Sequence, residues 1–165
     1  MASRSAWTAG NGAGLTWATA INSSDLASMA TAHAVLSTVA DIANGTALDQ
    51  FMDISFSLLI ASSTIGAGAT INFYIYALNQ DGTTYGDGQL TAGSQSAATP
   101  AVPPCFAWTV PAVAATTTIV GDSCNSPIVL PPGSFRIAMQ SLIGFSLTAG
   151  TQTVRYRTYN INLNN

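Results

Sequence analysis

The strongest constraint on the fold is a two-residue alternation of apolar side chains between residues 54 and 77. The alternating positions on the two sides of a Gly66-Ala-Gly68 connection are Ile54, Phe56, Leu58 and Ile60 before it, and Ile71, Phe73, Ile75 and Ala77 after it. A period of two places successive side chains on opposite faces of a β-strand. We therefore expect two antiparallel strands joined as a hairpin, with one face of their sheet buried and Tyr74 and Tyr76 on the other.

Shorter apolar segments separated by turn residues indicate further strands. We expect them at about residues 15–21, 34–42, 105–110, 116–120, 135–147 and 152–163, with a short helix over about 26–32 capped within Asn22-Ser-Ser-Asp25. The Asn44-Gly45 pair and Pro131-Pro-Gly133 are typical of turns between strands. About seven to nine strands at this spacing predict an all-β fold, an antiparallel β-sandwich or jelly roll.

The length of 165 residues fits a single domain preceded by a short arm. Residues 1–14 contain few candidates for a core, and they end in the stretch Gly10-Asn-Gly-Ala-Gly14. Glycine-rich stretches are flexible, and this one follows no expected strand and lacks the lysine of a phosphate-binding loop. We therefore expect an extended N-terminal arm at 1–14, which a neighbouring chain could hold, and one β-sandwich domain at 15–165.

Charged side chains are unusually scarce. They make up 7% of the chain, against about 25% in ordinary soluble domains. All four basic residues are Arg and all seven acidic residues are Asp. Because surface charge normally keeps monomers apart, this composition favours a surface that neighbouring subunits cover. A surface solubilised only by uncharged Ser, Thr and Asn is the alternative.

The composition also argues against nucleic acid and membranes as partners. A net charge of −3 and four scattered arginines do not form the basic patch that nucleic acid requires. No charge occurs between Asp53 and Asp81, but Ser, Thr, Gly and Asn interrupt this segment too often for a membrane span. The amino end has no apolar stretch of secretory length, so we expect synthesis in the cytoplasm without a signal peptide.

Few side chains could carry out catalysis or hold a metal. His33 is the sole histidine, and we expect it to have a structural role. Asp49 and Asp53 are the nearest pair of carboxylates, and we expect them on a solvated strand edge rather than in a two-carboxylate site. The loop Asp81–Gly88 has ligands for calcium, but ordinary turn chemistry explains it as well. We expect no catalytic residue, metal or cofactor.

The two cysteines, Cys105 and Cys124, leave two alternatives open. They could form one disulfide, and two free buried thiols are equally compatible with a reducing compartment. Neither has a basic neighbour in sequence that would lower its pKa, so no nucleophilic role is expected.

Arg155 and Arg157 are candidates for an interface. They are two residues apart on an expected strand and so share one face, with Tyr156 and Tyr159 on the strand's other side or end. This face could pair with Asp side chains within the sheet, or it could bind a partner chain.

The tryptophans suggest a second use of the surface. Trp7 and Trp17, within the arm and close after it, are further candidates for an interface. Exposed aromatic rings can also bind sugars, which makes a carbohydrate-binding module the rival hypothesis. However, Trp7, Trp17 and Trp108 are far apart in sequence.

Three ordered stretches carry a resemblance to a known group of proteins. They are Asn79-Gln-Asp-Gly-Thr-Thr-Tyr-Gly-Asp-Gly88, Leu130-Pro-Pro-Gly-Ser-Phe-Arg136 and Val154-Arg-Tyr-Arg-Thr-Tyr-Asn160, together with the Asn44-Gly-Thr46 turn. The chain resembles small virion structural proteins of tailed bacteriophages over most of residues 44–160. The resemblance does not extend to residues 93–128 or to the arm.

This resemblance implies a single jelly-roll or sandwich domain without catalytic residues. It further implies a capsid decoration (cement) protein that binds the major capsid protein and copies of itself, with a trimer favoured, on the capsid surface of the virion. A receptor- or carbohydrate-binding module associated with a tail or fibre is the alternative.

Overall fold

The computed structural model describes residues 4–9, 16–60, 64–79, 81, 84–86, 90–112 and 117–164. These residues form one helical turn and eleven strands. The elements in chain order are β1 (Arg4–Ala9), β2 (Ala18–Ile21), α1 (Ser23–Leu26), β3 (Ala34–Leu36), β4 (Phe51–Leu59), β5 (Thr70–Ala77), β6 (Gln95–Ser96), β7 (Phe106–Thr109), β8 (Thr118–Asp122), β9 (Ile128–Val129), β10 (Phe135–Leu142) and β11 (Thr153–Asn164). The prediction of a nearly all-β chain is confirmed. The strand number exceeds the prediction because β1, within the expected arm, and β6 and β9, of two residues each, were not expected.

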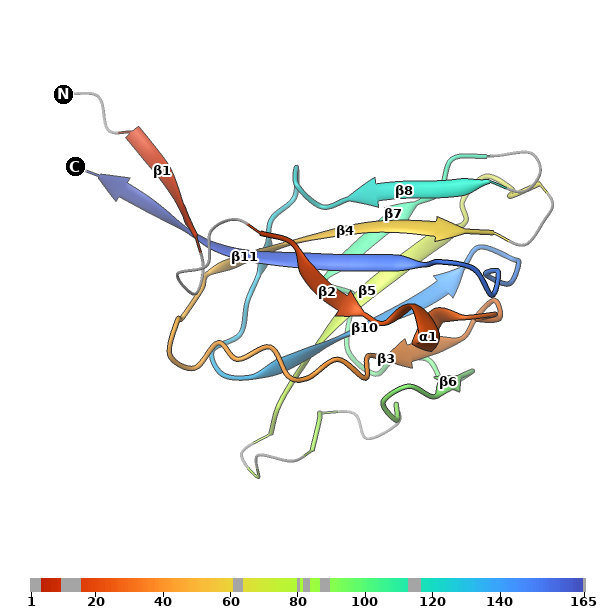
Figure 1. The fold of residues 1–165 in the computed structure, drawn as a ribbon, viewed down its shortest axis with the longest axis horizontal. Helices are drawn as coiled ribbons and strands as arrows, with labels where there is room; N and C mark the ends of the chain where they lie inside the picture. Colours follow the sequence, from red (N-terminus) through yellow and green to blue (C-terminus); the bar gives the residue numbers. More distant parts are fainter. Residues whose placement is uncertain are drawn as a thin grey trace.

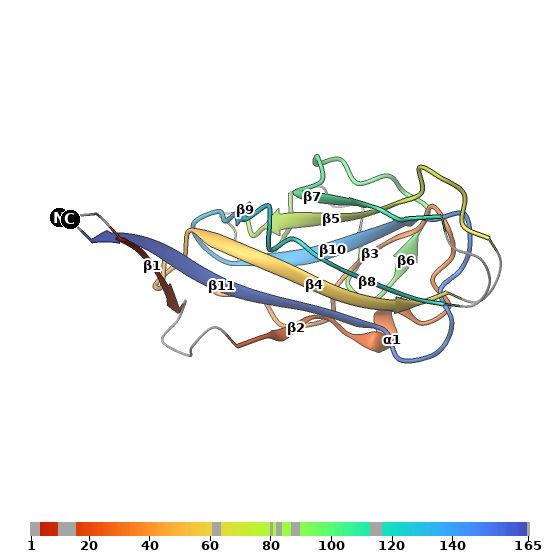
Figure 2. The ribbon, with the colours of Figure 1, turned by 90° about the horizontal axis from the view of Figure 1, so that it is seen from above.

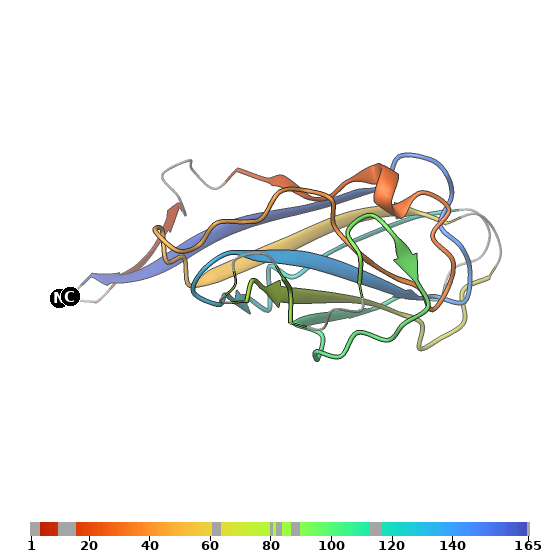
Figure 3. The same ribbon diagram turned by 90° about the horizontal axis from the view of Figure 1, so that it is seen from below.

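The strands form two antiparallel sheets, which Figures 1, 2 and 3 show as two layers. In the six-stranded sheet β11 lies between β4 on one side and β1 and β2 on the other, and β4 also pairs with β8 and β9. The five-stranded sheet has the order β6-β3-β10-β5-β7. The main core lies between the sheets and includes Ile54 and Phe56 of β4, Phe73 of β5 and Met139 of β10.

The predicted hairpin between residues 54 and 77 is wrong. β4 belongs to the six-stranded sheet and β5 to the five-stranded sheet, so their connection crosses from one layer to the other. The ring centroids of Phe56 and Phe73 lie 5.4 Å apart within the core. The physical reason is that the large apolar side chains of the two strands pack against each other face to face, which buries more apolar surface than side-by-side pairing would.

The five-stranded sheet is covered on both faces, although the alternation predicted one buried face. Tyr74 and Tyr76 of β5 are buried in a second cluster on the outer side of this sheet. The other buried members of the cluster are Ala34, Leu36, Leu90 and Ala138. The second face is buried because Leu90 packs on it, together with the partly buried Tyr85 and Val102.

The helix comes earlier and is shorter than predicted. α1 is a single turn, Ser23–Leu26, and the expected cap residues bind elsewhere. Asn22 Nδ2 donates to Thr38 Oγ1 at 2.7 Å, and the carboxylate of Asp25 accepts a bond from Thr38 N at 2.8 Å. These bonds tie α1 to the chain after β3, and the strand expected over 34–42 is regular only at Ala34–Leu36.

The two ends of the chain pair with each other. β1 pairs with β11 from Arg4 opposite Asn164 to Ala9 opposite Tyr159, and Figures 1 and 2 show this pair projecting from the body. We call β1 together with residues 159–164 the terminal ribbon. The part of the expected arm that the structure describes is therefore held by a strand of its own chain. The arm boundary and residues 1–3 and 10–15 lie outside the described residues.

Candidate interaction surface

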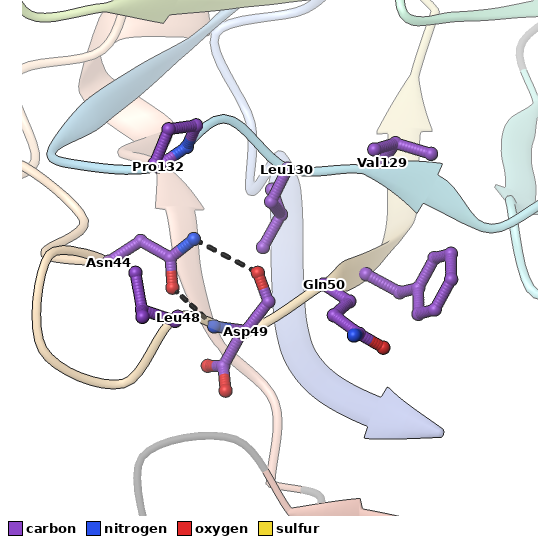
Figure 4. Close-up of a pocket in the computed structure, with 8 residues that line it drawn as sticks. Asn44, Leu48, Asp49, Gln50, Val129, Leu130 and Pro132 are labelled. Carbon is purple, nitrogen blue, oxygen red and sulfur yellow. Dashed lines mark hydrogen bonds between the residues drawn. The ribbon is translucent and has the colours of Figure 1, made fainter. Parts of the chain in front are cut away.

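A largely apolar pocket lies where β4 begins. Its volume is about 310 Å³, and Figure 4 shows the side chains around it. The lining residues are Asn44, Leu48, Asp49, Gln50, Phe51, Val129, Leu130 and Pro132. They come from the loop before β4, from the start of β4, and from β9 with the turn that follows it. We call this site the Leu48 pocket.

Asn44 holds the loop of the Leu48 pocket in place. Its Nδ2 donates to the carbonyl oxygens of Asp49 (3.0 Å) and Pro131 (2.9 Å), and its Oδ1 accepts a bond from Asp49 N at 2.6 Å. The turn expected at Asn44-Gly45 is present. A buried asparagine that serves three backbone groups fixes this loop against the turn after β9.

Two large apolar side chains at the Leu48 pocket face solvent. Leu48 is 59% exposed and Val129 is 72% exposed. Leu48 also has a positive φ of 48°, an uncommon conformation for a branched residue. A loop that holds a leucine in a strained, solvent-exposed conformation presents apolar surface that a partner could bury.

The outer face of the six-stranded sheet contains a buried ionic cluster. Arg157 donates from Nε and Nη2 to Asp53 Oδ2 at 2.9 and 2.8 Å, and Tyr159 donates to Asp53 Oδ1 at 3.0 Å. The Arg157 guanidinium lies 4.7 Å from the centre of the Trp17 ring. Burial, and then the hydrogen bond to Asp53, raise the pKa of Tyr159. We call Asp53, Arg157, Tyr159 and Trp17 the Arg157 cluster.

The Arg157 cluster shows which partner Arg157 has, and it corrects the expected positions of Tyr159 and of two aspartates. Arg157 pairs with an Asp of its own sheet. Tyr159 lies on the same face as Arg157, whereas Tyr156 packs against the core on the other face. Asp49 and Asp53 are both buried and do not lie on a solvated strand edge. Asp53 is buried because β4 has neighbouring strands on both sides, and Asp49, in the loop before β4, bonds to Asn44 and Asn160.

A second, three-residue cluster of similar chemistry lies on the outer face of the five-stranded sheet. Arg136 of β10 donates from Nε to Asp41 Oδ1 at 2.6 Å, and the Tyr85 hydroxyl donates to the same oxygen. The guanidinium carbon lies 5.0 Å from the Tyr85 ring centre. Burial, and then the bond to Asp41, raise the pKa of Tyr85 to about 12. Nothing in the sequence pointed to this Arg136 cluster, because its members are far apart in the chain.

The four predicted interface residues are only partly brought together. Trp17 and Arg157 touch, as described above. Arg155 is exposed, has no ion pair among the described residues, and lines a polar recess of about 260 Å³ with Thr19, Ser23 and Gln152. The backbone of Trp7 pairs with Ile161 in the terminal ribbon.

The tryptophans do not converge in the described part of the chain. Trp108 packs edge-on against Phe56 with ring centroids 5.2 Å apart, so it contributes to the core. Trp17 lies over Arg157 on the outer face of the six-stranded sheet.

The remaining candidate residues take part in local structure. His33 Nδ1 donates to Thr31 O at 3.0 Å, and Asp81 Oδ1 accepts a bond from Thr84 N at 2.9 Å, as in an ordinary turn. Asp87, the second carboxylate of the loop that was considered for calcium, lies outside the described residues. Within the described ranges, no group of three or more metal-binding side chains occurs.

Both cysteines are free thiols. Cys105 Sγ donates to Phe73 O at 3.3 Å beside the five-stranded sheet, and burial raises its pKa to about 12. Cys124 Sγ accepts a bond from Arg157 Nη2 at 3.7 Å beside the six-stranded sheet, and burial raises its pKa as well. A raised pKa keeps a thiol protonated and poorly nucleophilic.

Comparison with family models, with curated proteins and with solved structures found no match for this chain. In the part of the chain that the structure describes, no helix has the length and apolar character needed to cross a membrane.

Proposed function

We propose that this chain is a non-enzymatic virion structural protein, a capsid decoration (cement) protein built on a jelly-roll sandwich. In this proposal it binds the major capsid protein and copies of itself on the outside of a bacteriophage head. The exposed apolar surface of the Leu48 pocket, in a chain with 7% charged residues, is the observation that carries it.

The pairing of strands supports the jelly-roll part of the proposal. Eight strands pair from the outside of the sequence inward: β2 with β11, β3 with β10, β4 with β8, and β5 with β7. β11 then pairs with β4, and β10 with β5, which gives two sheets of four. A nested arrangement of this kind supports a jelly roll, a fold found in viral capsid proteins and in lectins. Because one fold serves many functions, the surface has to decide between them.

The Leu48 pocket favours a protein partner. Leu48 and Val129 together with Phe51 and Pro132 offer an apolar rim and floor, and burial of apolar area contributes about 25 cal/mol per Å². Many copies on one shell would add avidity to a weak single contact. The non-enzymatic part rests on the engagement of carboxylates within the chain: Asp25, Asp41 and Asp53 each accept hydrogen bonds from neighbouring residues.

The test compares two exposed strand valines. Particles of the virus that encodes this chain, stripped of it, would be incubated with the Val129→Asp variant and with the Val120→Asp variant. Val120 is 66% exposed on β8 and does not line the pocket, so it is a matched control. We expect the Val129 variant to lose occupancy by at least tenfold and the Val120 variant to keep it, measured by gel densitometry of sedimented particles. Equal occupancy of the two variants, or wild-type protein that does not sediment with the particles, contradicts the proposal.

The polar recess beside Arg155 supports a second candidate, a receptor- or carbohydrate-binding module. The recess is lined by hydroxyl and amide groups and by Arg155, which has no ion pair with any residue that the structure describes. Such a lining suits a saccharide better than the apolar lining of the Leu48 pocket does. A glycan array on the isolated domain, with Arg155→Ala as the comparison, separates the two proposals: saccharide binding lost in that variant favours the second.

A further inference from the structure

The last strand extends beyond the sheet that contains it. β4 pairs with β11 from Ser57 opposite Thr153 to Phe51 opposite Tyr159, and Phe51 is the first residue of β4. β1 pairs with the other side of β11, out to Asn164. Residues 161–164 therefore have β1 on one side and, among the described residues, no strand on the other (Figure 1).

This free edge lacks the features with which proteins usually prevent strand association. An unpaired edge presents N–H and C=O groups to any extended chain, and native proteins block it with lysine, proline or a bulge. Residues 158–165 contain no charged residue and no proline. A ribbon of two strands is also marginally stable by itself, whereas three or more strands are stable. The ribbon as it stands is an incomplete sheet.

The sequence of this edge is self-complementary when two copies of it pair antiparallel. We propose that the partner is a second copy of this chain, and that two β11 strands pair antiparallel about a two-fold axis at Asn162. In this register Ile161 faces Leu163 of the other copy, and like side chains meet on both faces of the new sheet. No charge is placed opposite its own copy. The two ribbons become one four-stranded sheet in the order β1-β11-β11-β1, and the interface is isologous.

The neighbouring surface fits this arrangement. At the base of the free edge, Asn160 Nδ2 donates to Asp49 Oδ1 at 3.1 Å, and Gln50 N donates to Asn160 Oδ1 at 2.9 Å. The edge therefore begins beside Asp49 and Gln50, which line the Leu48 pocket, so a second chain on the edge would start next to that pocket. Strand addition of this kind takes its affinity from backbone bonds and its specificity from adjacent pockets. The contact yields a dimer rather than the trimer that the resemblance implies.

The test uses charge reversal on the axis. In Asn162→Lys and in Asn162→Asp, each homodimer places a charge opposite itself, and we expect about fivefold weaker dimerisation for each. Mixing the two variants puts Lys opposite Asp and restores association as a one-to-one heterodimer. Asn125→Lys and Asn125→Asp, at an exposed turn, are the controls and should behave as wild type in both experiments. Sedimentation over rising concentration measures dimerisation, and native mass spectrometry identifies the mixed species.

Three results would overturn the inference: wild-type protein that stays monomeric at its highest soluble concentration, a trimer, or mixed variants that show no preference for the heterodimer. The inference deepens the proposed function, since it names one of the partners, yet the two fail separately. Loss of the dimer in Asn162→Lys with unchanged binding to particles leaves the decoration role intact without needing the dimer. A charge-dependent dimer that does not bind particles supports the pairing and removes the decoration role.

Discussion

The Arg157 cluster and the Arg136 cluster contain the same groups in different degrees of contact with water. In both, an arginine of a long strand pairs with an aspartate, a tyrosine hydroxyl donates to that aspartate, and an aromatic ring lies against the guanidinium. The ring is that of Trp17 in the Arg157 cluster and that of the donating tyrosine, Tyr85, in the Arg136 cluster. The Asp53 side chain is 2% exposed, and the Asp41 side chain is 29% exposed. A carboxylate removed from water depends on its partners, whereas a hydrated one does not. The two clusters therefore show how much the burial of the carboxylate, rather than the chemistry of the ion pair, contributes to stability.

Removal of the arginine should give the largest difference in stability between the two clusters. Arg157→Ala leaves the Asp53 charge buried with one partner fewer, and we expect a loss of about 3 kcal/mol or more in the free energy of unfolding. Arg136→Ala leaves a carboxylate that water reaches, and we expect about 1 kcal/mol or less. Urea unfolding followed by tryptophan fluorescence measures both.

Salt provides the control for this pair of variants. Exposed charges are screened at high ionic strength and buried ones much less. The stability difference between wild type and Arg136→Ala should shrink in 1 M salt, where the Debye length is about 3 Å, and that between wild type and Arg157→Ala should persist. Equal losses for the two variants would show that burial of the carboxylate does not decide the outcome.

Removal of each tyrosine hydroxyl is the next largest change. Tyr159→Phe takes a donor from buried Asp53, and a hydrogen bond to a charged group contributes about 1.5–3 kcal/mol. Tyr85→Phe takes a donor from Asp41, where water can replace it, so we expect a loss below about 1 kcal/mol. The two substitutions keep the ring, so each tests the hydroxyl alone. Thermal unfolding by circular dichroism gives the order, and a larger loss for Tyr85→Phe would contradict the comparison.

The sequence predicted the strands better than their partners. Alternation identified β4 and β5, and it placed Phe56 and Phe73 on apolar faces, as the structure has them. Alternation does not say which strand lies beside which, because period two fixes only the face on which a side chain lies. The hairpin prediction failed for this reason. The nested pairing of β2 with β11 joins segments over 130 residues apart, and no local signal contains it.

The candidate sites show the same limit. The spacing of Arg155 and Arg157 gave their shared face, but not that Asp53, 104 residues away, would be the partner of one and not of the other. The Leu48 pocket was missed, although the Asn44-Gly45 turn was identified. A turn signal predicts backbone geometry, and it does not reveal which apolar side chains the turn leaves exposed.

Unfolding at alkaline pH tests the tyrosine of each cluster through its raised pKa. The pKa of Tyr85 is raised to about 12 and that of Tyr159 is also raised, in both cases first by burial. The unfolded chain ionises its tyrosines near pH 10, so the fold retains protons that the unfolded chain has lost. The stabilising contribution is complete below about pH 10 and is lost as the pH rises towards about 12. Unfolding free energies across this window should fall steeply for wild type and less steeply for Tyr159→Phe and Tyr85→Phe; parallel curves for all three would refute the assignment.

The aromatic ring over Arg157 should make the smallest contribution to the free energy of unfolding. Trp17→Leu keeps apolar contact with Arg157 but removes the ring face, whereas Trp17→Phe keeps a weaker ring face. A cation–π contact at a partly exposed site contributes about 0.5–1 kcal/mol, so Trp17→Leu should be less stable than Trp17→Phe by no more than that amount. In a background of Arg157→Ala the difference should vanish, because no cation remains for the ring to contact. A difference that persists in this double-mutant cycle would mean that Trp17 acts by shielding Asp53 from water, and burial alone would then distinguish the two clusters.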